Sequence, residues 1–172
     1  MKQTILFLTI LSLSLNCFGQ KTDTEFTNPD IQMGMVVSDL DASLHFYTAI
    51  IGMVQTGSFD VKPEKARQLG LTDGKELNVT VLRLKDSEAS NQLKIMSFGN
   101  KYDMNQKQYI NDDLGVQYFT IYPKSLKPVL ERIKENDIPM LGDTPVKLNE
   151  KDSFIMIQDP DGTFIELIGP MN

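Results

Sequence analysis

The chain carries one order of strand and helix signals twice, and this repeat limits the folds that it can adopt. Each half opens with a β-branched and apolar run, continues with apolar residues at helical spacing, and ends with further strand-like runs. The predicted modules span residues 30–99 and 115–170, joined by a polar linker at 100–114. Strands beside one helix in each half predict a single α+β domain over residues 30–170.

The first predicted helix has clear boundaries in the sequence. Ser38 or Asp39 supplies an N-cap, and Gly52 is the expected stop. A short helix and loop are predicted within the insertion at 62–74, and a second long helix at 125–136. Strands are predicted at 31–37, 54–60, 77–84 and 93–98 in the first half, and at 116–122, near Met140, and at 147–148, 154–158 and 163–168 in the second.

The last two strands flank the turn Asp159-Pro160-Asp161-Gly162, where Pro presets φ and Gly accepts positive φ. We expect these four residues to serve the turn. The strand after them is apolar except for Glu166. A lone carboxylate in such a strand points to solvent or is held by a partner such as a metal or a cation.

The first 19 residues have the features of a secretory signal peptide. Lys2 gives a positive start, an apolar stretch follows, and small residues precede a cut after Gly19. Cys17 permits a lipoprotein interpretation, but Asn16 is a poor match to the residue before a lipidated Cys, so plain export to the periplasm or exterior is favoured. Residues 20–29 are predicted to be a flexible lead-in.

The net charge of −6, without a basic cluster, argues against nucleic acid and anionic membranes as partners. The apolar stretch of the leader is also too short to span a membrane. The only Cys lies in the leader, so the mature domain has no thiol chemistry. These observations favour a small molecule as the partner.

Two segments resemble the vicinal oxygen chelate superfamily of glyoxalase I, extradiol dioxygenases and bleomycin resistance proteins. They are Val36–Tyr47 followed by Ile51-Gly52-Met53, and Asp159–Leu167. The resemblance covers about Ile31 to Gly169. It implies two βαβββ modules that form a curved mixed sheet around a central pocket.

The resemblance also implies where metal enzymes of the superfamily place their ligands, on the first and last strands of each module. These positions fall on Gln32, Lys94, Gln117 and Glu166 in this chain. Gln32 lies 62 positions before Lys94 and Gln117 lies 49 before Glu166. The difference of 13 equals the length of the insertion at 62–74.

This set is a poor one for a transition metal, because an ammonium is not a ligand and two amides are weak donors. We therefore predict no metal, and an ion pair between Lys94 and Glu166 where an ion would sit. In the alternatives that remain, Lys94 reaches out to solvent, and Gln32 and Gln117 only line a wet cavity. Met96 shares the strand face of Lys94 and is a further candidate pocket residue.

The favoured function is metal-free binding of a small organic molecule by these five residues. Bleomycin resistance proteins, which the chain resembles, bind a drug without chemistry between two subunits, which implies a possible homodimer. The alternative is a divalent-metal lyase, isomerase or dioxygenase in which Glu166 is ligand or base. Glu166 is the best catalytic candidate, including for a weaker third hypothesis of cofactor-free acid–base catalysis.

Overall fold

The computed structural model describes residues 25–27, 30–99 and 107–172. The predicted signal peptide, with Cys17, and part of the predicted linker lie outside these residues. The first module consists of β1 (Met33–Val36), α1 (Leu40–His45), the π-helical turn η1 (Phe46–Ile51), β2 (Val54–Val61), α2 (Pro63–Gln68), β3 (Leu77–Arg83) and β4 (Gln92–Met96). The second consists of β5 (Tyr118–Ile121), α3 (Lys127–Glu135), β6 (Val146–Lys147), β7 (Ser153–Gln158) and β8 (Phe164–Gly169).

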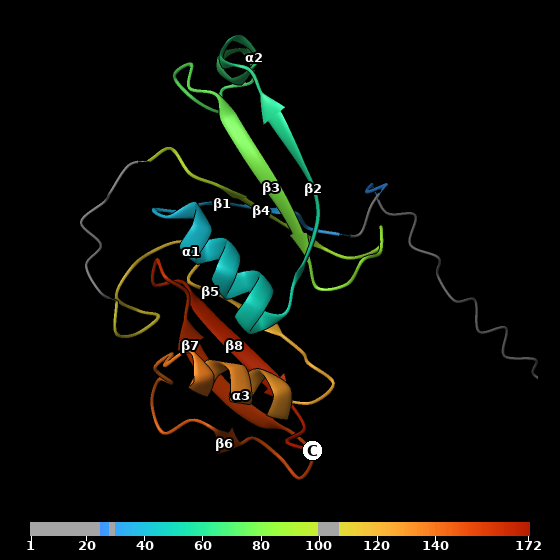
Figure 1. The fold of residues 1–172 in the computed structure, drawn as a ribbon, viewed down its shortest axis with the longest axis vertical. Coiled ribbons are helices and arrows are strands. Elements are labelled where there is room, and N and C mark those ends of the chain that lie inside the picture. Colours follow the sequence, from blue (N-terminus) through green and yellow to red (C-terminus); the bar gives the residue numbers. More distant parts are fainter. Residues whose placement is uncertain (1–24, 28–29, 100–106) are drawn as a thin grey trace, which may run out of the picture.

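The two modules have the same sheet topology (Figure 1). The strand orders are β1-β4-β3-β2 in the first sheet and β5-β8-β7-β6 in the second. In each sheet the first strand of the module pairs in parallel with the last, and the remaining pairs are antiparallel. The prediction of an α+β fold built from two βαβββ modules is therefore confirmed.

One face of each sheet contributes to a single core that both modules share. Because side chains alternate along a strand, the buried side chains of β4 come from every second residue, and Ile165 and Leu167 of β8 enter the same core. Helix α1, the turn η1 and helix α3 pack into the same core, and Arg132 of α3 donates hydrogen bonds to the carbonyls of Ile50 and Ile51. The core includes Leu82, Leu93, Ile95, Ile121, Ile155, Ile157, Ile165 and Leu167.

The first helix starts and ends at the residues that the sequence indicates. Asp39 is the N-cap and accepts a hydrogen bond from the backbone N–H of Ala42. Gly52 ends the segment in the left-handed region, with φ of 93°, where a side chain would be strained. Between them the helix widens into a π-helical turn that buries both Phe46 and Tyr47.

The strand predicted near Met140 is wrong. Residues 139–141 form a loop, and a hydrogen bond from Leu141 N–H to the Met156 carbonyl ties it to β7. Pro139 has no N–H to donate, and Gly142 turns the chain away with φ of 61°. A strand with a regular hydrogen-bond ladder therefore does not form between these two residues.

Strands β2 and β3 form a long hairpin that projects from the body, with α2 at its tip (Figure 1). Ala66 of α2 packs with Leu77 and Val79 of β3 in a small second core. Met96 and Phe98 pack against this cluster. Within the described part of the chain, no helix is long and apolar enough to cross a membrane.

Candidate functional site

The two segments that carry the superfamily resemblance lie against each other in the fold. Asp161, in the turn between β7 and β8, accepts hydrogen bonds from both the backbone N–H and the hydroxyl of Ser38. Ser38 directly precedes the N-cap of the first helix. A contact spanning 123 residues of sequence thus joins the start of module 1 to the end of module 2.

Tyr47 and Asp159 form a second, buried link between the same segments. The Tyr47 hydroxyl donates a 2.7 Å hydrogen bond to Asp159 Oδ2, and Asp159 Oδ1 accepts from the backbone N–H groups of Asp161 and Thr163. Burial raises the pKa of Asp159, although these donors oppose the shift. Burial and the neighbouring Asp159 carboxylate raise the pKa of Tyr47 well above its ordinary range. These residues are satisfied internally and serve the fold, as expected for this turn.

The first sheet has an open face opposite the shared core, which we call the Lys94 face. Strand register places its side chains in three rows across the sheet. The row at the β3–β4 loop is polar, the middle row contains Lys94 between small residues, and the third row is apolar. The first two rows are Gln92–Arg83–Val54 and Gly34–Lys94–Val81–Gly57. The third consists of the pair Val36–Met96 and the pair Val79–Phe59, with Met96 packed against the cluster that contains Val79.

Lys94 stands at the centre of this face with open space beside it. Its neighbour on β1 is Gly34, and the row ends on β2 at Gly57. A Cβ added at Gly57 would meet nothing within 4 Å, and one at Gly34 would meet only Met96 Cε, at 3.9 Å. The Lys94 ammonium lies 5.7 Å from the centroid of the Phe59 ring, a cation–π distance.

Arg83 provides a second cation on the Lys94 face, in the next row of the neighbouring strand. One terminal nitrogen of its guanidinium donates to the carbonyl of Ser87 in the β3–β4 loop. Its Nε atom is buried and has no hydrogen-bond partner. The strand positions of this face, all of which are described, include no Asp or Glu.

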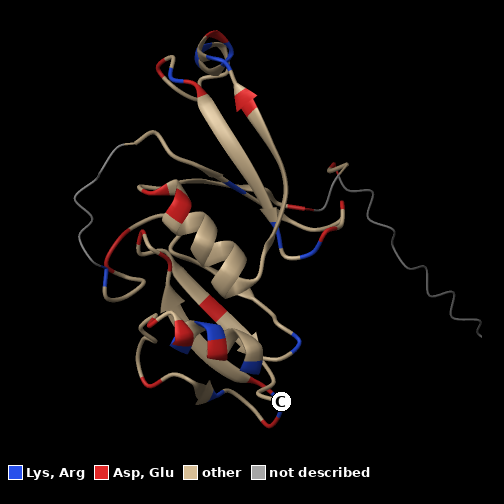
Figure 2. Ribbon diagram, viewed as in Figure 1, with Lys and Arg blue, Asp and Glu red and all other residues tan. Residues whose placement is uncertain are grey.

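The second sheet has a corresponding Glu166 face. Register places Thr120, Glu166 and Met156 in one row across β5, β8 and β7. The Thr120 hydroxyl donates a 2.6 Å hydrogen bond to Glu166 Oε2, which fixes the half-buried carboxylate. The strand positions of this face carry no Lys or Arg among the described residues. Figure 2 shows most charged residues of both signs on helices and loops.

Gln117 is not the structural counterpart of Gln32. Lys94 pairs with Gly34 on β1, and Glu166 pairs with Thr120 on β5, so Gln32 and Tyr118 each stand two residues before the paired position. A shift of one residue moves a side chain to the opposite sheet face. Alternation therefore directs Gln117 away from the face of Glu166, and its Oε1 instead accepts a 3.5 Å hydrogen bond from Lys107.

The structure does not join the predicted site residues into one cluster. The Lys94–Glu166 ion pair is absent from the chain, since the ion pairs among the described residues are Lys62–Glu76 and Lys107–Asp113. Gln32 is exposed, and Met96 is half-buried on the Lys94 face as expected. No hydrogen bond joins any two of the five candidates among the described side chains. Tyr118 and Gly34 are not predicted from the sequence, because their roles depend on register between strands.

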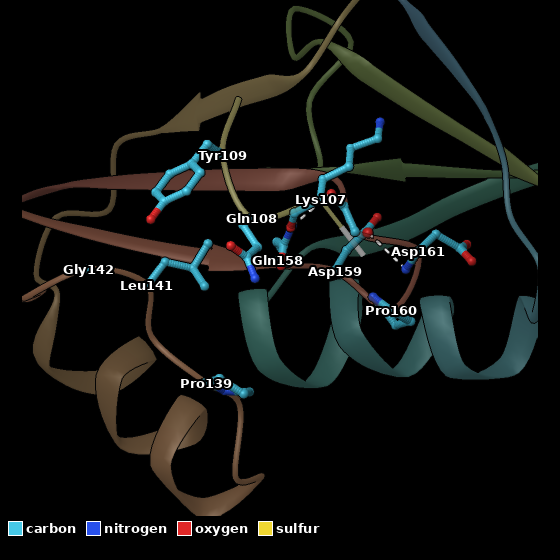
Figure 3. A pocket seen from close by; sticks show the side chains of 11 residues that line it. Lys107, Gln108, Tyr109, Pro139, Leu141, Gly142, Gln158, Asp159, Pro160 and Asp161 are labelled. Carbon is cyan, nitrogen blue, oxygen red and sulfur yellow. Dashed lines mark hydrogen bonds between the residues drawn. The ribbon is translucent and has the colours of Figure 1, made fainter. Parts of the chain in front are cut away.

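A cavity of about 590 Å³ lies elsewhere (Figure 3). It is bounded by the 107–109 segment, the loop at 139–142 and the turn after β7. Two of its polar residues are engaged within the protein, because Gln158 donates to the Lys107 and Gly162 carbonyls and Asp159 is held as above.

A second cavity of about 400 Å³ lies where β1 of the first module approaches the second module. It is lined by Met33, Gly34, Met35, Leu93, Val116, Phe119 and Thr163. This lining is mostly apolar, and Met33, Met35 and Leu93 belong to the sheet face opposite Lys94.

Comparison with known proteins identifies the class of the fold. The family model of the Glyoxalase/Bleomycin resistance protein/Dioxygenase superfamily matches residues 31–167. The chain belongs to this superfamily. No curated protein matches the chain.

Solved structures of the superfamily have the same fold at low sequence identity. A glyoxalase family protein from Bacillus cereus aligns with a TM-score of 0.68 at 16% identity, covering 88% of this chain and 99% of its own. The trypanothione-dependent glyoxalase I of Leishmania major gives 0.54 at 22%, covering 80% and 84%. A maize glyoxalase I variant gives 0.58 at 23%, covering 81% of this chain and 43% of its own.

The metal that the resemblance implies for enzyme members does not fit the residues at the corresponding positions. With the corrected register these are Gln32, Lys94, Tyr118 and Glu166, which include one carboxylate, one ammonium and no imidazole. A divalent transition metal needs several imidazole, thiolate or carboxylate donors. Among the described residues, no three His, Cys, Asp or Glu side chains are grouped to hold an ion.

Proposed function

We propose that this protein binds a small organic molecule on the open faces of its two sheets, without a divalent metal. The observation that carries the proposal is Lys94, a half-buried cation at the position where metal enzymes of the superfamily have a ligand. A cation there repels a metal ion and attracts an anionic group. The apolar side chains around it supply the contact area that small-molecule sites usually have.

We further propose that two copies of the chain form the complete site. Within one chain the Lys94 face and the Glu166 face are not joined by an ion pair, yet they carry charges of opposite sign. Pairing the Lys94 face of one copy with the Glu166 face of another would bring these charges together. Phe59 and Tyr118, 43% and 44% exposed in the single chain, would then be covered.

Export through the leader at 1–19 completes the proposal, with the mature protein acting in the periplasm or outside the cell. Its support is the sequence of the leader alone. Mass spectrometry of the secreted protein tests it, because a new N-terminus at Gln20 supports plain export. A lipid-modified N-terminus at Cys17 would instead require membrane anchoring.

The proposal is tested by elemental analysis of the purified protein and by thermal unfolding with added Ni²⁺, Zn²⁺ or Mn²⁺. We expect no stoichiometric metal and no change in melting temperature. A ligand present at a hundred times its Kd that binds only the native state adds about 2.7 kcal/mol to stability. A tight metal site would therefore raise the melting temperature clearly. Stoichiometric metal with a raised melting temperature would contradict the proposal.

The variant Lys94→Glu is a positive control, because it restores a carboxylate to the site. We expect it to gain affinity for Ni²⁺ or Mn²⁺, whereas Lys94→Gln, which removes the charge without adding an anionic donor, should not. Absence of any gain in Lys94→Glu would show that these positions do not converge on one site.

A metal-dependent lyase, isomerase or dioxygenase remains the second candidate. The Thr120 hydrogen bond favours it to the extent that it orients Glu166 as a ligand or base would require. Metal bound by the wild-type protein would select this candidate, and its activity would then require Glu166.

A further inference from the structure

The Lys94 face differs from the rest of this acidic protein in having cations and no acidic strand residue. Lys94 and Arg83 both point to this side of the sheet, from neighbouring strands. The chain as a whole has a net charge of −6. Two cations that share a face without a carboxylate repel each other, so an added anion relieves that repulsion.

Neither cation is neutralised by the described part of the protein. Lys94 has the Phe59 ring and no ion pair with any described carboxylate. Arg83 uses one terminal nitrogen on a backbone carbonyl and leaves its buried Nε–H without an acceptor. A buried donor without an acceptor is costly, and guanidinium donors match the geometry of a carboxylate.

Two glycines, Gly34 and Gly57, leave open space on the sheet surface beside Lys94, although the backbone conformation requires glycine at neither position. Neither Gly34 nor Gly57 has a left-handed conformation, and a Cβ at either would fit. Larger residues would favour the strands, since glycine weakens them. Such open space is useful where another molecule lies close to the sheet.

The third row of the face supplies an apolar surface next to the cations. Val36 and Phe59 are substantially exposed, at 53% and 43%, and Met96 is half-buried between β1 and β3. Helix α2 and Phe98 pack with Val79 and Met96 and so close the end of this surface. The face is thus charged at one side and apolar at the other.

From this arrangement we infer that the Lys94 face selects an organic monocarboxylate with an apolar body. The carboxylate of the ligand contacts Lys94 and Arg83. The space at Gly34 and Gly57 admits the carbon chain of the ligand, and its apolar body lies along Met96, Val36 and Phe59. In the two-copy site, Lys94 and Arg83 of one copy face a single carboxylate, Glu166 of the other, which leaves a net charge of +1. This inference rests on the proposed function, because it names the ligand class for the same site.

The test compares 4-phenylbutyrate with its neutral analogue 4-phenylbutanol by calorimetric titration of the purified protein in the presence of EDTA. We expect the acid to bind about tenfold more tightly than the alcohol, the effect of one partly screened charge interaction. Lys94→Met should remove this preference, and Lys94→Arg should keep it. The matched control is Lys62→Met, which removes an exposed lysine that pairs with Glu76 on the distal hairpin.

The outcomes separate this inference from the proposed function. Equal binding of acid and alcohol, or a preference that persists in Lys94→Met, overturns the inference while metal-free binding stands. Binding of the acid only when Ni²⁺ or Zn²⁺ replaces EDTA overturns both. Circular dichroism of Lys94→Met confirms that its fold is intact, and Lys94→Gln substitutes for it if the fold is lost.

Discussion

Two regions of the molecule differ in how completely their polar groups are satisfied. One is the link between the two family motifs, and the other is the open sheet faces. In the link, Asp159 and Asp161 accept five hydrogen bonds between them, from side chains and backbone. On the Lys94 face, by contrast, a buried Arg83 N–H has no partner. Satisfied polar groups hold a fold together, whereas a buried unsatisfied one needs an explanation, and Ser43 Oγ and Gln117 Nε2 are two further such atoms among the described residues. The contacts between the family motifs therefore support the fold, and the proposed binding site lies on the sheet faces.

The largest effect on stability is expected from Asp159→Ala. The change leaves the Tyr47 hydroxyl and two backbone N–H groups without their acceptor, so the free energy of unfolding should fall by about 3 kcal/mol. Denaturant unfolding measures it. Glu166→Ala is the matched control, since it removes a carboxylate with one side-chain hydrogen bond and should cost about 1 kcal/mol. Equal losses in the two variants would remove the distinction between link and face.

Tyr47→Phe should flatten the pH dependence of stability in alkali. In the unfolded chain Tyr47 loses its proton near pH 10, while the raised pKa keeps it protonated in the native state. Wild-type stability should therefore fall by about 1.4 kcal/mol per pH unit from this residue as the pH rises above 10. The variant should lack this slope, although it loses about 1 kcal/mol at neutral pH. Tyr109→Phe, at an exposed tyrosine, is the control, and a slope shared by all three proteins would contradict the assignment.

Glu166→Gln is expected to strengthen binding of 4-phenylbutyrate by a few fold. The substitution removes the carboxylate that competes with the ligand for Lys94 across the two-copy site. Calorimetric titration measures the change, and Thr120→Val is the matched control, because it removes the hydrogen bond to Glu166 and keeps the charge. Weaker binding of the acid by Glu166→Gln would contradict the pairing of the two faces.

Gly34→Val should separate stability from binding with the smallest effect on the fold. The valine suits a strand and its Cβ meets only a flexible methionine, so stability should rise by about 0.5 kcal/mol. Its branched side chain would fill the open space beside Lys94, so both phenylbutyrate and phenylbutanol should bind more weakly. The matched variant Ser58→Val adds the same side chain to an exposed position that pairs with Thr80, on the other sheet face. Unchanged binding in Gly34→Val would show that this space is not used.

Sequence periodicity predicted the fold well because each element follows from local chemistry. The N-cap Asp39 and the stop at Gly52 are readable without knowing any partner strand. The strand predicted near Met140 is wrong because Pro139 and Gly142 flank it. Those two residues govern the backbone, and apolar content does not override them.

The candidate site was less predictable because it depends on pairing between strands. Glu166 and Lys94 follow from the motifs, and both lie on open sheet faces. The sequence predicts Gln117 where the structure has Tyr118, one residue further along. The prediction compares the number of residues between two positions in each module, and an extra residue in one strand, such as the bulge residue Thr56 in β2, shifts that number by one. No local signal reveals that Arg83 and Lys94 share a face, or that Gly34 stands beside Lys94.

The most direct test of metal-free anion binding is the thermal unfolding of the wild-type protein under two conditions. We predict that 4-phenylbutyrate raises the melting temperature in the presence of EDTA, and that Ni²⁺, Zn²⁺ or Mn²⁺ without the acid leaves it unchanged. A melting temperature that rises with a metal, and does not respond to the acid under chelation, would contradict the account.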